Sequence, residues 1–243
     1  MVVRICKDTQ AMGKAAAALF VALATEKPNA VFGLATGSTP VPTYSEMAAA
    51  YQAGAVDYSG ITTFNLDEYV GLAPDHPQSY RYFMETNLFK HINIPTENTH
   101  VLSGLATDPE AECAAYEAMI DAAGGIDLQI LGIGNNGHIA FNEPAADFAA
   151  VTHTVQLTES TIEANKRFFD SVDDVPRSAY TMGIGSIMKA KKIVLLANGA
   201  AKADAIKAMV EGPVTPECPA SILQFHPDCV VLVDEAAASK LSK

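Results

Sequence analysis

The chain has 243 residues, of which 49% are hydrophobic and 18% are charged. This composition excludes an intrinsically disordered chain, because it provides enough apolar surface to offset the entropy that folding costs. The formal net charge of −12 argues against a general nucleic-acid-binding protein. An acidic surface also repels anions at long range, so an anionic substrate would need specific cations and backbone N–H groups to hold it.

The N-terminal residues lack the apolar run of a signal peptide, and no stretch of about 18 apolar residues could cross a membrane. The four cysteines form no C-x-x-C pair, so we expect free thiols in a reducing compartment. These features predict a soluble, cytoplasmic protein.

Short β-branched apolar runs alternate with longer helical patterns along the chain. The predicted strands are Val2–Cys6, Ala30–Ala35, Ile61–Leu66, Ile126–Gly132, Thr152–Leu157, Ala179–Ile184, Ile193–Ala197 and Cys229–Val233. The predicted helices are Thr9–Thr25, Pro40–Gln52, Ser79–Phe89, Pro109–Ala123, Ser160–Phe169 and Ala200–Glu211. The alternation predicts an α/β fold, an open, mostly parallel Rossmann-like sheet with helices on both faces, as a single domain over residues 1–243.

A small polar segment lies between a predicted strand and a predicted helix. It comprises Thr36, Gly37, Ser38 and Thr39 and is preceded by Ala35. Glycine permits close backbone approach, the hydroxyls can donate, and a helix N-terminus offers free N–H groups, so the segment is a candidate phosphate-binding turn. It is not a Walker A loop, because no Gly-Lys-Ser/Thr follows. An ordinary turn capped by Ser or Thr is the alternative.

Two carboxylates and a tyrosine, Asp67, Glu68 and Tyr69, lie where another predicted strand ends. Adjacent residues on a strand point in opposite directions, so the two carboxylates should differ in role. One would enter a crevice while the other faces a helix or solvent. A solvated acidic turn is the alternative interpretation.

The segment GIGNNGHIAFNEP at residues 132–144 begins with the spacing G-x-G-x-x-G directly after a predicted strand. A dinucleotide site needs a helix next, and Asn142 and the final proline argue against one. The glycines would instead let a loop turn sharply and present Asn136, His138 and Glu143. A histidine beside a carboxylate can act as a general acid and base near neutral pH. A surface histidine in a glycine-rich loop is the alternative.

Two basic residues, Arg167 and Lys202, are candidate phosphate anchors, although each could be an ordinary surface base. Lys202 lies near a predicted helix start, where a cation opposes the helix dipole and so suggests an anionic ligand. The histidines are scattered and no H-E-x-x-H motif occurs, which argues against a metal site. A serine hydrolase is not indicated either, because the chain has no G-x-S-x-G motif.

Together these segments resemble the glucosamine-6-phosphate deaminase family, in its short, non-allosteric form. They follow the family's order over nearly the whole chain. The matching segments are LATGSTP at 34–40, FNLDEY at 64–69, SYRYF at 79–83, the block at 132–144, EANKRFF at 163–169, GAAK at 199–202 and LQFHP at 223–227.

The resemblance implies conversion of glucosamine 6-phosphate and water to fructose 6-phosphate and ammonia. It implies that Asp67 moves a proton between C2 and C1, and that His138 with Glu143, helped by Asn136, opens the sugar ring. It also implies a set of substrate-binding residues: Ala35, Thr36, Gly37, Ser38, Thr39, Tyr80, Arg167 and Lys202. The substrate carries its own amine and masked carbonyl, so no cofactor or metal is expected.

Two departures from the family pattern matter. Many members have Asp where this chain has Asn136, which can form hydrogen bonds but carries no charge at neutral pH. The longer allosteric members have serines, then Arg and Lys, where this chain has Ala146, Asp147, His153 and Val155. We therefore expect no activation by N-acetylglucosamine 6-phosphate. We also expect a monomer or small homo-oligomer that binds neither nucleic acid nor membrane.

Two other functions stay open at this point. A 6-phosphogluconolactonase would share the general fold but would not need a base at Asp67 or the full pairing of His138 with Glu143. A non-catalytic sugar-phosphate sensor would be expected to carry a fused DNA-binding module and an incomplete set of acid and base residues.

Overall fold

A seven-stranded sheet forms the centre of the protein, here in a computed structural model that describes residues 1–157, 159, 162, 163, 166, 169, 171 and 175–242. Its strands lie in the order β1-β10-β9-β6-β2-β3-β5, and every neighbouring pair is parallel. The strands are β1 (Val2–Cys6), β2 (Val31–Leu34), β3 (Thr62–Asn65), β5 (Thr99–His100), β6 (Leu128–Leu131), β9 (Lys192–Ala197) and β10 (Cys229–Asp234).

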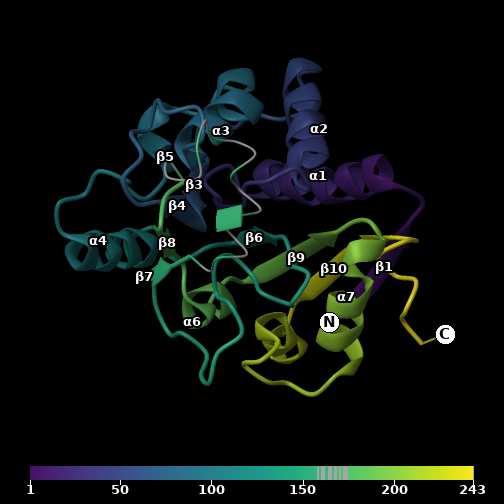
Figure 1. Cartoon of the computed structure of the whole chain (residues 1–243). Coiled ribbons are helices and arrows are strands. Elements are labelled where there is room, and N and C mark those ends of the chain that lie inside the picture. The colour runs from purple at the N-terminus through teal and green to yellow at the C-terminus, as the bar shows by residue number, and fades with distance from the viewer. Residues whose placement is uncertain are drawn as a thin grey trace.

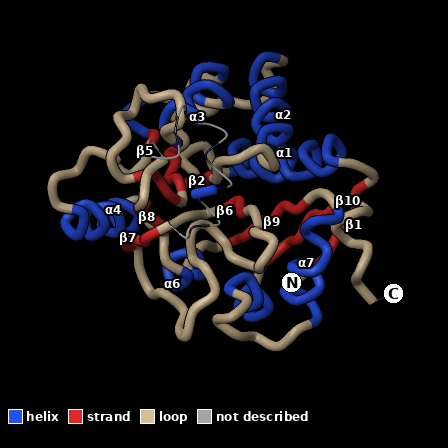
Figure 2. Tube along the Cα trace, in the orientation of Figure 1, coloured by secondary structure: helices blue, strands red, loops and turns tan. Residues whose placement is uncertain are grey.

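A second, three-stranded sheet lies against the first and is antiparallel, in the order β4-β8-β7. Its strands are β4 (Asp67–Tyr69), β7 (His153–Gln156) and β8 (Ser178–Thr181). Only Leu66 separates β3 from β4, so the chain passes from one sheet into the other within one residue. Figure 2 shows the short strands of this second sheet beside the ends of the central one.

The helices cover both faces of the central sheet: α1 to α3 lie above it and α6 and α7 below it in Figure 1. Phe20 of α1 packs on Phe32, whereas Tyr116 of α4 packs on Phe64, whose side chain points to the opposite face. The helices are α1 (Thr9–Glu26), α2 (Val41–Gln52), α3 (Tyr80–Asn87), α4 (Pro109–Ala122), α6 (Ile184–Met188) and α7 (Ala203–Glu211).

Helix starts follow from the sequence. The side chain of Asp8 accepts a hydrogen bond from the backbone N–H of Ala11 at 2.8 Å and so caps α1. Asp108 caps α4 in the same way, with Pro109 in the first turn, where a missing N–H costs nothing.

The amino end of the central sheet is stabilised by one buried carboxylate, Asp127, which is 7% exposed. It lies 2.8 Å from the Nζ of Lys27 and 2.7 Å from the Nζ of Lys191, and it accepts the backbone N–H of Val31. Burial would raise the pKa of Asp127, but these partners outweigh burial and lower it.

The predicted open, mostly parallel α/β sheet is confirmed, and each predicted strand corresponds to an observed one. The strand predicted at Ala179–Ile184 runs too far, because β8 ends at Thr181 and α6 begins at Ile184. The helix predicted at 79–89 ends at Asn87 and is followed by a 3-10 turn, and Ala200–Lys202 is a 3-10 turn before α7. The helix predicted at 160–169 lies largely outside the described residues.

Candidate active site

Four loops meet at the carboxyl edge of the central sheet, because β9, β6, β2 and β3 are consecutive neighbours there. Ligands of open α/β sheets bind at this edge. The loops are those that follow Leu34, Asn65, Leu131 and Ala197, and each predicted catalytic or binding segment apart from those of Tyr80 and Arg167 begins in or directly after one of them.

The turn after β2 has the features of an anion site. Gly37 has a φ of +97°, a conformation that side-chain-bearing residues rarely adopt, and the turn closes around it. Among the described residues no side-chain hydrogen bond caps the N-terminus of α2, so the capped-turn alternative is wrong. Because Pro40 and Pro42 have no N–H, the donors that this turn can offer an anion are the backbone and hydroxyl groups of residues 36–39 and the N–H of Val41. The hydroxyl of Thr39 donates to the Oδ1 of Asn198 at 3.0 Å, which joins this turn to the loop after β9.

Lys202 lies on that second loop, at the residue preceding α7. Burial lowers the pKa of its ammonium group. Gly199, which opens the loop, has a φ of +85°, and its N–H donates to both carboxylate oxygens of Asp234 at 3.0 Å. A partly buried ammonium near a helix N-terminus is unfavourable on its own, and a bound anion would offset that cost.

Asp67 is the first residue of β4 and is 7% exposed. Within the described part of the chain its carboxylate receives no hydrogen bond that would stabilise its charge. Burial, and secondly the neighbouring carboxylate of Glu68, raise the pKa of Asp67 to about 8. Such a carboxylate is a stronger base than an exposed one, as proton abstraction from carbon requires.

Glu68 points the other way and has a structural role. It is 2% exposed and accepts three backbone hydrogen bonds: from Tyr69 at 2.8 Å, Tyr80 at 2.9 Å and Arg81 at 3.0 Å. Burial raises the pKa of Glu68, although these N–H groups act to lower it. Its carboxylate thereby ties β4 to the start of α3. Because both carboxylates are buried, the alternative of a solvated acidic turn is wrong.

Aromatic rings lie beside Asp67. Tyr80 stacks on Phe141 with ring centroids 6.2 Å apart and planes at 8°, and its centroid lies 4.9 Å from that of Tyr69. Burial, followed by Tyr69 and Asp67, raises the pKa of Tyr80 well above its usual value. Tyr80 therefore lies within electrostatic reach of the candidate base.

The loop after β6 brings an imidazole and a carboxylate together. The Nδ1 of His138 lies 3.2 Å from the Oε1 of Glu143, a contact within ion-pair distance that is not aligned as a hydrogen bond. The amide of Asn136 donates to the other oxygen of Glu143 at 2.6 Å, and its own oxygen accepts from the backbone N–H of His138 at 3.2 Å. Glu143 thus lies between Asn136 and His138, and no helix follows the glycines, as predicted.

The backbone of this loop explains how two residues five positions apart can meet. A β-carbon on Gly134 would overlap the imidazole ring of His138, so a side chain at position 134 would displace the ring from its place beside Glu143. Between Ile139 and Asn142 the chain reverses, with Ala140 at a φ of +51°, a strained conformation for alanine.

A buried threonine fixes the loop relative to the candidate base. The backbone N–H of Phe141 donates to the Oγ1 of Thr181 at 3.0 Å, and Thr181 is the register partner of Asp67 in the second sheet. No local sequence pattern marks Thr181 as a site residue, because its position depends on strand pairing.

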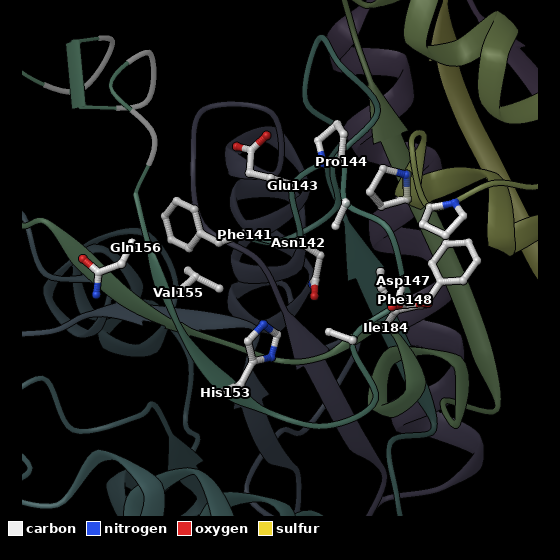
Figure 3. A pocket seen from close by; sticks show the side chains of 14 residues that line it. Phe141, Asn142, Glu143, Pro144, Asp147, Phe148, His153, Val155, Gln156 and Ile184 are labelled. Atoms are coloured by element: carbon white, nitrogen blue, oxygen red, sulfur yellow. The ribbon is translucent and has the colours of Figure 1, made fainter.

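A pocket of about 310 Å³ lies behind the loop, as Figure 3 shows. Among the site residues predicted from the sequence, Glu143 alone belongs to its described lining. In Figure 3 the carboxylate of Glu143 points away from His153, which lies across the pocket. The pocket therefore borders the candidate site without containing its base or its anion-binding turn.

The structure places the described predicted residues in two groups, one on the turns after β2 and β9 and the other on β4, the start of α3 and the loop after β6. Arg167 lies outside the described residues. In the described part of the chain, no three His, Cys, Asp or Glu side chains are arranged to hold a metal ion. None of the described helices is both long enough and apolar enough to span a membrane.

Sequence comparison identifies close relatives. Residues 7–231 match the family model of glucosamine-6-phosphate isomerases and 6-phosphogluconolactonase. A glucosamine-6-phosphate deaminase of Clostridioides difficile is 58% identical over 242 residues, covering 100% of this chain and 97% of the relative. One from Thermoanaerobacter pseudethanolicus is 56% identical, covering 98% of this chain and 94% of the relative.

Solved structures agree with the sequence relatives. A monomeric glucosamine-6-phosphate deaminase is 44% identical and superimposes with a TM-score of 0.96, covering 99% of this chain and 100% of that one. The 6-phosphogluconolactonase of Leishmania guyanensis superimposes with a TM-score of 0.78 at 21% identity, covering 100% of this chain and 99% of that one, which shows a shared fold alone.

Proposed function

Because the chain belongs to the family of glucosamine-6-phosphate isomerases and 6-phosphogluconolactonases, we propose that it acts on a phosphorylated amino sugar as a deaminase. It converts glucosamine 6-phosphate and water to fructose 6-phosphate and ammonia. The observation that carries the proposal is the buried, unstabilised carboxylate of Asp67, next to a loop that pairs His138 with Glu143. The relatives at 55–58% identity over nearly the whole chain are all named for this activity.

Ring opening comes first, because the sugar's carbonyl is masked in the closed ring. His138 takes the proton of the O1 hydroxyl and returns a proton to the ring oxygen, which frees the C1 aldehyde. The carboxylate of Glu143 stabilises the charged imidazole between these two transfers, and Asn136 holds that carboxylate in place.

Proton transfer follows on the open chain. Asp67 removes the proton from C2 while a proton passes from the substrate's ammonium group to O1, which gives a neutral enolamine. Asp67 then returns its proton to C1, which gives a protonated imine at C2. Water adds to the imine carbon and ammonia leaves, so the products are fructose 6-phosphate and ammonia. The amine and the carbonyl that drive these steps both belong to the substrate.

The phosphate is remote from C1 and C2, so its binding energy orients the sugar rather than taking part in the chemistry. The backbone from Ala35 to Thr39, together with the ammonium group of Lys202, holds this phosphate, and Tyr80 contacts the sugar. Arg167 adds a second cation. The net charge of −12 makes such local cations necessary.

The protein works as a cytoplasmic monomer or small homo-oligomer without allosteric activation. The monomeric relative at 44% identity supports this proposal, as does the absence of Arg and Lys at positions 153 and 155. A hyperbolic substrate curve, unchanged by N-acetylglucosamine 6-phosphate, is the expected result, and a sigmoidal curve relieved by that compound would contradict it.

The decisive experiment measures ammonia and fructose 6-phosphate released from glucosamine 6-phosphate. In parallel, hydrolysis of 6-phosphogluconolactone is measured with the same protein. Stoichiometric release of both products is expected, with negligible lactone hydrolysis. The reverse pattern would assign the lactonase activity instead, and binding of sugar phosphates without turnover of either compound would assign a sensor.

Changing Asn136 to Asp tests how the neutral amide affects the pH profile. Asp at this position replaces the amide donor, which lies 2.6 Å from Glu143, with a second acceptor, so the two carboxylates would repel each other or share a proton. Either outcome changes the group that faces His138, so we expect the pH profile of kcat to differ clearly from that of the wild type. The matched control is Asn135→Asp, which adds the same charge at the exposed neighbouring residue. Identical profiles for the two variants would contradict the role given to Asn136.

A further inference from the structure

We propose that two side chains outside the substrate site, Tyr44 of α2 and Asp234 of β10, are positioning residues that hold the two anion-binding turns in their binding shape. The inference rests on the proposed function, because it takes residues 36–39 and Lys202 as the phosphate site. Neither Tyr44 nor Asp234 belongs to the predicted set of substrate-binding residues.

Tyr44 holds the first turn at its base. Its side chain is completely buried, and its hydroxyl accepts the N–H of Ala35 at 3.1 Å and donates to the carbonyl oxygen of Ala35 at 2.5 Å. Ala35 is 5% exposed and lies directly beyond the end of β2, where the ladder of strand hydrogen bonds stops. One phenol oxygen therefore satisfies both backbone groups of the residue that precedes Thr36.

Removing that oxygen would leave a buried N–H and a buried C=O without partners. Buried backbone groups are almost always paired, because an unpaired one costs about as much as a lost hydrogen bond. The backbone at Ala35 would shift until both groups found partners. The neighbouring N–H groups of the turn would move with it, away from the geometry that binds phosphate.

Asp234 holds the second turn. Its carboxylate accepts the N–H of Gly199 on both oxygens at 3.0 Å and the N–H of Ala237 at 2.8 Å. The carbonyl oxygen of Gly199 in turn accepts a hydrogen bond from the backbone N–H of Lys202 at 3.1 Å. Asp234 therefore sets the position of the backbone from which the Lys202 side chain extends. The two turns are joined by the hydrogen bond from Thr39 to Asn198, the residue before Gly199.

The direction in which phosphate binding changes when Asp234 is substituted distinguishes a positioning role from a purely electrostatic one. A carboxylate near an anion site repels the anion, so removing its charge alone would strengthen phosphate binding. If Asp234 acts by holding Gly199, its removal weakens phosphate binding instead. An Asn at this position keeps one acceptor oxygen and would restore part of the binding that Ala loses.

The first test compares Tyr44→Phe with a matched control, Tyr58→Phe. Tyr58 is also fully buried, and its hydroxyl donates to the carbonyl of Met47 at 3.3 Å, away from both turns. For Tyr44→Phe we expect the KM for glucosamine 6-phosphate and the Ki of inorganic phosphate to rise about tenfold, the size that unpaired buried groups produce. We expect kcat to stay within about threefold, because the lost interaction is present equally in the ground and transition states.

Unchanged KM and Ki in Tyr44→Phe, or equal rises in both variants, would overturn the positioning role. If Tyr44→Phe does not fold, the decision falls to Asp234→Ala and Asp234→Asn, with folding checked by melting temperature. We expect the Ki of phosphate to rise about fivefold or more in the Ala variant and less in the Asn variant. A lower Ki in both, or no change in either, would overturn the proposal.

The wild-type protein separates this inference from the function it rests on. A wild type that neither turns over glucosamine 6-phosphate nor binds inorganic phosphate would refute the proposed function, and the positioning role would fall with it. A wild type that does both, beside variants that match it in KM and Ki, would refute the positioning role alone.

Discussion

Replacing Asp67 with Asn is expected to lower kcat about 10³-fold or more while the protein stays folded. The amide has nearly the shape of the carboxylate but cannot take the C2 proton, so the isomerisation loses its base. KM should change little, because the phosphate and ring contacts that hold the sugar remain. Steady-state kinetics of ammonia release measure both quantities.

The control for this result is Glu68→Gln, the neighbouring carboxyl, which is also buried but faces α3. Its side-chain amide can keep acceptor contacts to α3, so activity should fall far less than in Asp67→Asn. Comparable losses in the two variants would show that Asp67 acts through local structure, and residual activity of Asp67→Asn above a tenth of wild type would contradict its role as the base.

Asp67→Asn should also make the folded state more stable, because burying the charged carboxylate of Asp67 costs free energy of folding. The pKa of Asp67 is raised to about 8 in the folded protein, above that of an unfolded aspartate. Between about pH 4 and 8 the folded state therefore binds more protons than the unfolded state, and its stability falls as pH rises through this window. At pH 8 and above, Asp67→Asn should gain about 2 kcal/mol in free energy of unfolding.

Asp127 provides a matched comparison, because its substitution by Asn should change the free energy of unfolding in the opposite direction. It is as buried as Asp67, at 7% exposure, but Lys191 and Lys27 outweigh its burial and lower its pKa. Its stabilising effect is present above the unfolded pKa and is lost as pH falls, so Asp127→Asn should be less stable than wild type at pH 8. Urea denaturation of both variants at pH 5 and pH 8 measures the contrast. The stability change of Asp67→Asn should differ between the two pH values, whereas that of Asp127→Asn should be the same at both, because Asp127 is ionised throughout this range. A change in Asp67→Asn that is equal at both pH values would contradict the prediction.

The central sheet could be predicted from the sequence because its strands are buried on both faces and read as continuous apolar runs. The second sheet could not be predicted as a separate unit. Its first strand, Asp67–Tyr69, is three residues long and mostly polar, and only pairing with β8 makes it a strand. Residues 153–156 and 178–181 look like further strands of the main sheet, since nothing local marks an antiparallel pair.

The residues of the candidate site also divide into those that local sequence patterns predict and those that they do not. The glycines around His138 and the hydroxyls of residues 36–39 mark their loops in the sequence, because turns and anion sites need particular residue types. Tyr44 and Thr181 carry no such mark. Each resembles an ordinary core residue, and its contact with the site arises from helix placement or strand register, which local patterns do not specify.

Replacing His138 with Gln is the second change with a large expected effect. Glutamine can form hydrogen bonds but cannot carry a proton from O1 to the ring oxygen, so turnover would depend on the small amount of open-chain sugar that forms without the enzyme. We expect kcat to fall about 10²–10³-fold. Binding should be preserved, which is measured with the linear amino alditol 6-phosphate as a competitive inhibitor, since this compound has no ring to open.

Glu143→Gln should have a smaller effect than His138→Gln, about tenfold on kcat, because it removes the charge that stabilises the imidazolium but leaves the imidazole. The side chains are 3.2 Å apart and, in the proposed mechanism, act as one unit. The double variant should therefore lose no more activity than His138→Gln alone. Losses that multiply would mean that the two residues act in separate steps, and a raised Ki for the linear inhibitor in His138→Gln would assign His138 to binding instead of ring opening.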